Sequence, residues 1–112
     1  MTNKDRDVSE DEVGAYSFNL RRTAAVEQSL GRIRHSLASD WLKLQDDEIQ
    51  SLAWVLGEAW AHMGFYAWDQ LKLADINMDI TDILIDLGRR GRAGRLSPST
   101  AADKAVKVLS GL

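Results

Sequence analysis

Cysteine is absent from this chain of 112 residues, and its absence excludes several kinds of site. There can be no disulfide framework, no thiolate nucleophile and no zinc site with sulfur ligands. A chain of this length can still form a single hydrophobic core without such cross-links. We therefore expect one domain that depends on packing alone, with no cofactor.

Long apolar runs are also missing. The first thirteen residues, MTNKDRDVSEDEV, contain no apolar stretch of the kind found in secretory signals. No run approaches the ~20 apolar residues that cross a bilayer. With 45% hydrophobic and 28% charged residues, the composition is typical of a soluble globular protein. The sequence therefore predicts a cytoplasmic protein that does not contact a membrane.

Histidine is scarce, with two in the whole chain. Glu58 and His62 are one helical turn apart and could hold a metal or exchange a proton. With no second set of ligands, a solvated polar strip or an intersubunit hydrogen bond explains them better. The chain has no phosphate-binding glycine loop and no nucleophile elbow. We expect that the protein is not an enzyme.

A calcium loop is the other metal site that the spacing suggests. Oxygen-bearing side chains stand at its positions one, three, five and twelve (Asp75, Asn77, Asp79 and Asp86). Position six is Ile80, where the sharp turn of such a loop needs glycine. The apolar stripe from Ile80 to Leu87 fits a helix better, so we expect no metal.

Helical patterns dominate a sequence that has one proline. A stripe of apolar residues predicts a helix over residues 23–38, and a second stripe predicts one that ends near Gly88. Ser97 and Pro98 are typical of a helix start, and this last helix extends to about Ser110. We predict a mainly α domain of three or four helices over residues 13–112, preceded by a mobile, charged arm at 1–12.

The stretch from Asp46 to Ala74 is predicted to be one long central helix. One broad face carries most of its apolar residues, and a second apolar face carries Trp54, Ala61, Phe65 and Trp68. A helix that is apolar on two sides must be covered on both. This favours a homodimer and makes the second face a candidate protein-binding surface. The glycines Gly57 and Gly64 would let another helix approach closely; alternatively, Gly64 marks a kink or break.

Charge is segregated along the chain. Residues 46–86 hold nine acids and one base, whereas residues 87–112 hold six bases and one acid. Such blocks indicate that acidic and basic faces meet within the fold or between copies of it. The most basic stretch is predicted to be a loop from Arg89 to Arg95, with Arg89, Arg90, Arg92 and Arg95 able to grip phosphates. Alternatively, these cations stabilise the end of the preceding helix and offset nearby aspartates.

Residues 15–21 alternate polar with large apolar side chains, which favours a short strand; an irregular or helical lead-in is the alternative. Followed by a helix, a turn near Ala38–Asp40 and a second helix, Ser17-Phe18-Asn19-Leu20-Arg21 resembles the ribbon-helix-helix DNA-binding proteins. The resemblance implies a dimeric ribbon in the major groove, with Ser17, Asn19 and Arg21 as base readers.

Two hypotheses about function follow. The first is a non-catalytic, small helical protein that acts by protein–protein binding and self-association, as a regulator, adaptor or inhibitor. The alternative is a dimeric transcriptional regulator of the ribbon-helix-helix kind, with DNA as its partner.

Overall fold

The computed structural model describes residues 10–112, with side chains from Gly14 onward. These residues form five α-helices: α1 (Glu10–Leu37), α2 (Asp46–Met63), α3 (Phe65–Trp68), α4 (Met78–Arg92) and α5 (Pro98–Ser110). Two 3-10 helices, η2 (Ala38–Lys43) and η3 (Leu73–Asp75), connect them. The mainly α prediction is confirmed. The arm predicted for residues 1–12 falls outside the described residues, apart from 10–12, which begin α1.

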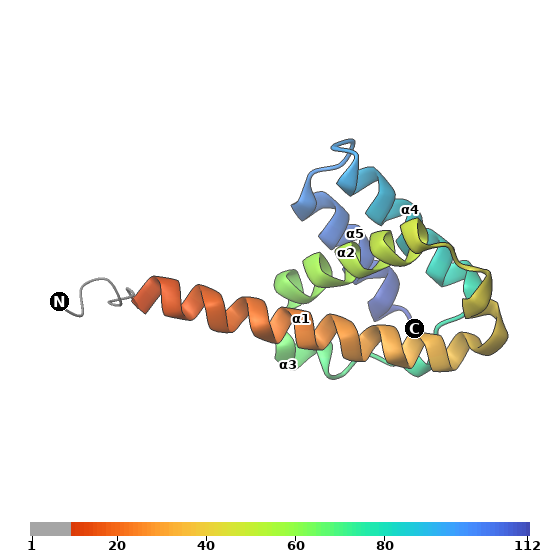
Figure 1. Cartoon of the computed structure of the whole chain (residues 1–112), viewed down its shortest axis with the longest axis horizontal. Helices are drawn as coiled ribbons and strands as arrows, with labels where there is room; N and C mark the ends of the chain where they lie inside the picture. The colour runs from red at the N-terminus through yellow and green to blue at the C-terminus, as the bar shows by residue number, and fades with distance from the viewer. Residues whose placement is uncertain (1–9) are drawn as a thin grey trace.

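Helix α2 lies at the centre of the fold and contacts α1, α4 and α5 (Figure 1). Its side chains Leu52, Val55, Leu56 and Ala59 are fully buried. Burying one leucine or valine side chain stabilises a fold by roughly 1.5–3 kcal/mol. The packed face of α2 is therefore the main source of stability, and the other helices are arranged around it.

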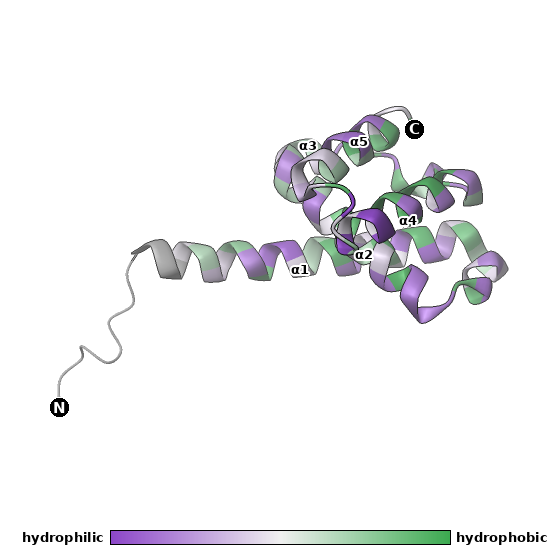
Figure 2. Cartoon of the chain, turned by 90° about the horizontal axis from the view of Figure 1, so that it is seen from above, coloured by the Kyte–Doolittle hydropathy of each residue, from purple (hydrophilic) through white to green (hydrophobic). Residues whose placement is uncertain are grey.

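Helix α1 is the longest element, with 28 residues, and it packs along the body from about Phe18 onward. Ile33 and Leu37 of the predicted stripe are buried there. The first part extends away from the other helices, and the molecule measures 56 × 29 × 26 Å (Figure 2). Residues 15–21 continue this helix, as in the helical lead-in that the sequence left open. The alternative of a short strand at residues 15–21 is not tested by the structure and stays a prediction.

The prediction of one helix over residues 46–74 is wrong, because α2 ends at Met63. Gly64 has φ 84° and ψ 153°, which no helical residue adopts and which side chains other than hydrogen disfavour. The chain turns there into the single turn of α3. Trp68 is thereby buried, and its Nε1 donates a hydrogen bond of 3.1 Å to Ser29 Oγ on α1. Gly64 therefore breaks the helix, as in the second of the two roles considered for it, rather than serving as a small residue within a continuous helix.

The prediction that a helix ends near Gly88 is also wrong, since α4 continues to Arg92. Gly88 and Gly91 remain helical because they are the points where α4 approaches α2. A Cβ on Gly88 would lie 2.1 Å from the Ser51 carbonyl oxygen, and one on Gly91 would lie 2.3 Å from the Trp54 ring. Residues 89–92 are accordingly helical rather than part of a loop.

The starts of α4 and α5 follow simple capping chemistry. Asn77 Oδ1 accepts a hydrogen bond from the Ile80 backbone N–H at 2.9 Å, which caps α4. Ser97 caps α5 in the same way, with Pro98 in the first turn, as predicted. The segment considered as a calcium loop is thus a 3-10 turn, a cap and a helix.

Candidate protein-binding surface

The four side chains predicted to form a second face on the central helix do not lie together. Trp54 is partly buried against Gly91 of α4, and Trp68 is buried against α1. Ala61 is exposed on α2, whereas Phe65, beyond the break, is 55% exposed on α3. The break at Gly64 separates the set, and Phe65 alone among its large side chains remains at the surface.

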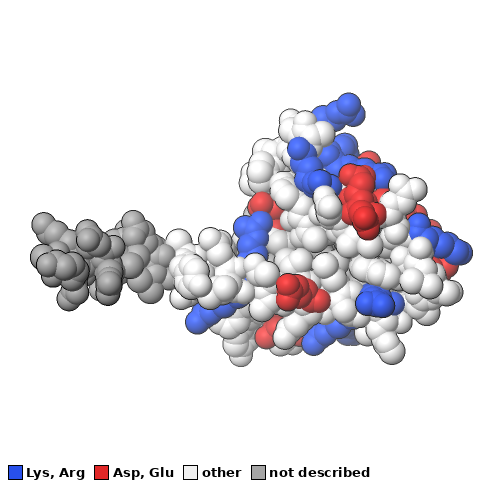
Figure 3. All heavy atoms as spheres, in the orientation of Figure 1, with Lys and Arg blue, Asp and Glu red and all other residues white. Residues whose placement is uncertain are grey.

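Exposed apolar side chains gather instead where the first half of α1 leaves the body. Tyr16 is 68% and Leu20 54% exposed on α1, and Tyr66 is 79% exposed beside Phe65 on α3. Tyr16 and Leu20 are one helical turn apart and lie on the side of α1 that faces away from the body. In the space-filling view, the described part of α1 nearest the N-terminus shows mostly uncharged atoms (Figure 3). Exposed aromatic and leucine side chains in one region of a molecule are typical of an interaction surface.

Phe18 fixes the point at which α1 leaves the body. Its ring lies 5.0 Å from the ring of Trp60, with the two planes at 50°. This tilted arrangement is favourable for aromatic pairs. One turn later, Arg22 Nη2 donates to Glu58 Oε1 at 2.8 Å, which joins α1 to α2 a second time. The direction of the projecting part is therefore set by one aromatic contact and one ion pair.

Two adjoining grooves lie on either side of Phe65. The first has a volume of about 480 Å³ and lies between α1 and the end of α2, lined by Gly14, Ser17, Phe18, Arg21, Trp60, Gly64 and Phe65. The second, of about 370 Å³, continues along α1 and shares Arg21, Trp60 and Phe65 with the first. We call the first the α1–α3 groove. Its walls carry three aromatic rings, those of Phe18, Trp60 and Phe65, so it can accept apolar side chains of a partner.

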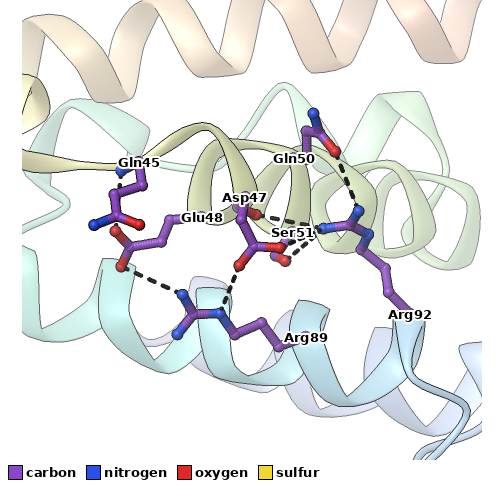
Figure 4. A network of polar contacts seen from close by, with 7 residues as sticks. All are labelled: Gln45, Asp47, Glu48, Gln50, Ser51, Arg89 and Arg92. Atoms are coloured by element: carbon purple, nitrogen blue, oxygen red, sulfur yellow. Dashed lines mark hydrogen bonds and ion pairs between the residues drawn. The ribbon is translucent and has the colours of Figure 1, made fainter.

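The acidic and basic blocks of the sequence meet within the fold, at the contact of α2 with α4 (Figure 4). Arg89 Nε donates to Asp47 Oδ2 at 3.1 Å. Arg92 donates to Ser51 Oγ at 2.9 Å and to Gln50 Oε1 at 3.1 Å. Both guanidinium groups donate hydrogen bonds to residues in the first turns of α2. This arrangement fits the structural alternative, in which the arginines offset nearby aspartates rather than bind phosphate.

Arg90 and Arg95 complete the basic stretch. Arg90 Nη2 lies 3.0 Å from Asp86 Oδ2, one turn earlier on α4. Arg95 is exposed in the connection between α4 and α5. Three of the four arginines considered for phosphate binding therefore already contact an acidic side chain. Such exposed pairs contribute little to stability, on the order of 0–1 kcal/mol each.

The residues considered as base readers are all exposed on α1. At about 100° per residue, Ser17 and Arg21 share one side of the helix and Asn19 lies on another. Residues 17 and 21 line the α1–α3 groove, whereas Asn19 lines a groove between α1 and α2 on the other side of α1. In this helical conformation the three side chains do not point in a common direction.

Glu58 and His62 have separate partners. Glu58 binds Arg22, as above, and His62 Nε2 lies 3.9 Å from Asp103 Oδ1 on α5. In the part of the chain that the structure describes, no group of three histidine, aspartate or glutamate side chains is placed to hold a metal ion. Within residues 10–112, no helix has the length and apolar character needed to cross a membrane.

Sequence reasoning missed Tyr16, Phe18, Leu20 and Tyr66 as surface residues. The signal for the first three was present but was interpreted with a period of two, as a strand. With the helical period, Tyr16 and Leu20 fall on one side and Phe18 on the opposite side. Tyr66 carried no signal of its own, because its exposure depends on the break at Gly64.

Comparison with models of known protein families, with curated proteins and with solved structures finds no match to this chain.

Proposed function

We propose that this chain is a non-catalytic cytoplasmic protein that works by binding another protein and by associating with a second copy of itself, as regulators, adaptors and inhibitors do. The proposal is supported by one observation above all. Large apolar side chains are exposed on both sides of the projecting part of α1 and on α3, among them Leu20 and Phe65. Uncovered aromatic and leucine side chains that cluster at one place are the usual anchors of protein interfaces.

The size of the effect can be worked out from the exposed fractions. Complete burial of a leucine or phenylalanine side chain is worth roughly 1.5–3 kcal/mol, and Leu20 and Phe65 each expose about half of their surface. Each side chain then contributes about 1 kcal/mol per copy when it is covered. A symmetric dimer whose interface covered both side chains would bury each of them twice, for a total of about 4 kcal/mol, or roughly a thousandfold in the dissociation constant.

Sedimentation velocity of the full chain over a range of concentrations tests self-association. We expect a dimer at micromolar concentrations and a monomer for the double variant Leu20→Gln/Phe65→Gln. The matched control is Leu42→Gln/Ile83→Gln, which removes two exposed apolar side chains elsewhere on the surface. A wild-type chain that stays monomeric at every concentration, or a control that dissociates equally, would contradict the proposal.

DNA binding is the alternative, and its three base readers do not point the same way on α1. It predicts affinity for duplex DNA that falls steeply with salt and is lost in Asn19→Ala and Arg21→Ala. Binding that these variants leave unchanged would remove the ribbon hypothesis and turn attention to Arg95 and its neighbours.

A further inference from the structure

We infer that the corner where α1 meets η2 receives the partner protein, and that the partner contributes an acidic segment with a large apolar side chain. The inference rests on the proposed protein binding and assigns a surface and a chemistry to it. It comes from three features of the corner: two adjoining grooves, cationic side chains without acidic partners, and an exposed leucine.

The corner is formed by a residue in the left-handed conformation. Ala38 has φ 51°, which ends α1 and turns the chain into η2. A groove with a volume of about 630 Å³ lies within this turn. Arg34 and His35 line it on the α1 side, and Trp41 and Leu42 line it on the η2 side. Cationic and apolar side chains therefore face the same groove.

A second groove, of about 480 Å³, adjoins the first along α1. The two share Gly31 and His35, and the second is also lined by Gln28 and Arg32. A Cβ added to Gly31 would meet no atom within 4 Å, so the boundary between the grooves is open. Residues 28–38 span about 15 Å of helix. A partner segment of about five extended residues would cover this length.

The arginines of the two grooves have no acidic partner. No ion pair joins Arg32 or Arg34 to another side chain within residues 14–112. Among the described residues, no aspartate or glutamate lines either groove. The acid of η2, Asp40, lies 3.1 Å from Lys43 Nζ and is offset by it. The grooves are thus complementary to carboxylates, which guanidinium groups bind through paired hydrogen bonds.

Leu42 supplies the apolar contact. It is 78% exposed, and Trp41 beside it is only partly buried. A large apolar side chain of a partner would cover both. The chain has a net charge of −3, so a long polyanion such as duplex DNA would be repelled beyond the grooves. A short acidic segment avoids this repulsion because it contacts only the grooves.

Selection of random peptides displayed on phage, with the full wild-type chain as bait, tests the chemistry of the partner. We expect the enriched peptides to carry aspartate or glutamate on either side of one large apolar residue. Enriched peptides without acidic residues would overturn the inference, as would a library that yields no binding peptide. Self-association is decided independently, by sedimentation velocity.

Fluorescence anisotropy with the most enriched peptide, labelled with fluorescein, tests the position of the site. At low salt, we expect Arg32→Gln and Arg34→Gln each to raise the Kd roughly three- to tenfold, with the effect declining as salt is added. Leu42→Gln should raise the Kd about tenfold at every salt concentration. The matched controls are Arg95→Gln and Ile83→Gln, which remove an exposed cation and an exposed apolar side chain elsewhere. Both should leave the Kd within about twofold.

The outcomes separate this inference from the proposed function. Peptides whose affinity falls with Phe65→Gln, and not with Leu42→Gln, would overturn the corner as the site while the proposed protein binding stands. Duplex DNA that displaces the peptide and depends on the same two arginines would overturn the acidic segment as the occupant. Dissociation of the dimer by Arg32→Gln or Arg34→Gln would show that a second copy occupies the grooves, and would overturn the assignment to another protein.

Discussion

Two glycines in helices, Gly88 and Gly31, should respond in opposite ways to the same substitution by alanine. In an unconstrained helix this change is favourable by about 1 kcal/mol. Gly31 lies on the exposed side of α1, where an added Cβ would meet nothing within 4 Å. We therefore expect Gly31→Ala to raise the free energy of unfolding by about 0.5–1 kcal/mol.

Gly88→Ala places the same methyl group against the backbone of α2. The added Cβ would lie 2.1 Å from the Ser51 carbonyl oxygen and 2.7 Å from its carbonyl carbon. Main-chain atoms cannot turn aside as a flexible side chain does, so α4 must move away by about 1 Å to restore ordinary van der Waals separation. Overpacking of this kind costs about 1–3 kcal/mol, and here the cost lies at the upper end because Arg92 and the apolar face of α4 move as well. After the gain in helix propensity, we expect a net loss of about 2 kcal/mol.

Urea unfolding followed by tryptophan fluorescence measures both effects, since the chain has four tryptophans, of which Trp60 and Trp68 are buried. Protein concentration must be held constant, because self-association would stabilise the folded state. A loss of about 2 kcal/mol is a large part of the 5–15 kcal/mol that holds most domains together. A Gly88→Ala variant as stable as the wild type would refute the close approach of α4 to α2, and a destabilised Gly31→Ala would refute the open surroundings of α1.

Two smaller changes test the buried hydrogen bond and the exposed ion pairs. Trp68→Phe keeps an aromatic ring against α1 but removes the Nε1 donor to Ser29 Oγ, so urea unfolding should show a loss of about 1–2 kcal/mol in the free energy of unfolding. The same substitution in a Ser29→Ala background should cost less, because the acceptor is already gone. Equal losses in the two backgrounds would show that the bond does not form. Asp47→Asn removes the charge that faces Arg89 and Arg92, and it should lower the free energy of unfolding by less than about 1 kcal/mol at low salt. The difference in stability from the wild type should vanish in 1 M sodium chloride. A difference that does not depend on salt would contradict an electrostatic role.

Local signals in the sequence were sufficient for part of the fold. The stripe from Ile80 to Leu87 and the Ser97–Pro98 start predicted α4 and α5 because capping and periodicity act within a few residues. The end of α4 could not be predicted in the same way. Gly88 has the features of a helix end, and what keeps it helical is its contact with Ser51, which is distant in the sequence.

Gly57 and Gly64 illustrate the same limit within one stretch. Both interrupt an apolar helical pattern, yet Gly57 stays inside α2 beneath the Arg22 guanidinium, and Gly64 ends the helix. The difference depends on α1, which covers Gly57 and receives Trp68 beyond the break. The candidate surface could not be predicted without that break, because the turn at Gly64 leaves Phe65 exposed and buries Trp68. Only Phe65 of the four predicted protein-binding residues could therefore be identified as part of the α1–α3 groove.

The length of α1 has a consequence for valency. At about 1.5 Å per residue, its 28 residues form a stiff rod of roughly 40 Å. The exposed side chains Tyr16 and Leu20 lie on the part of the rod outside the body, and the rod fixes their distance from the body. A partner with one site for the rod and one for the body would bind both at once, and its second site would bind at high effective concentration.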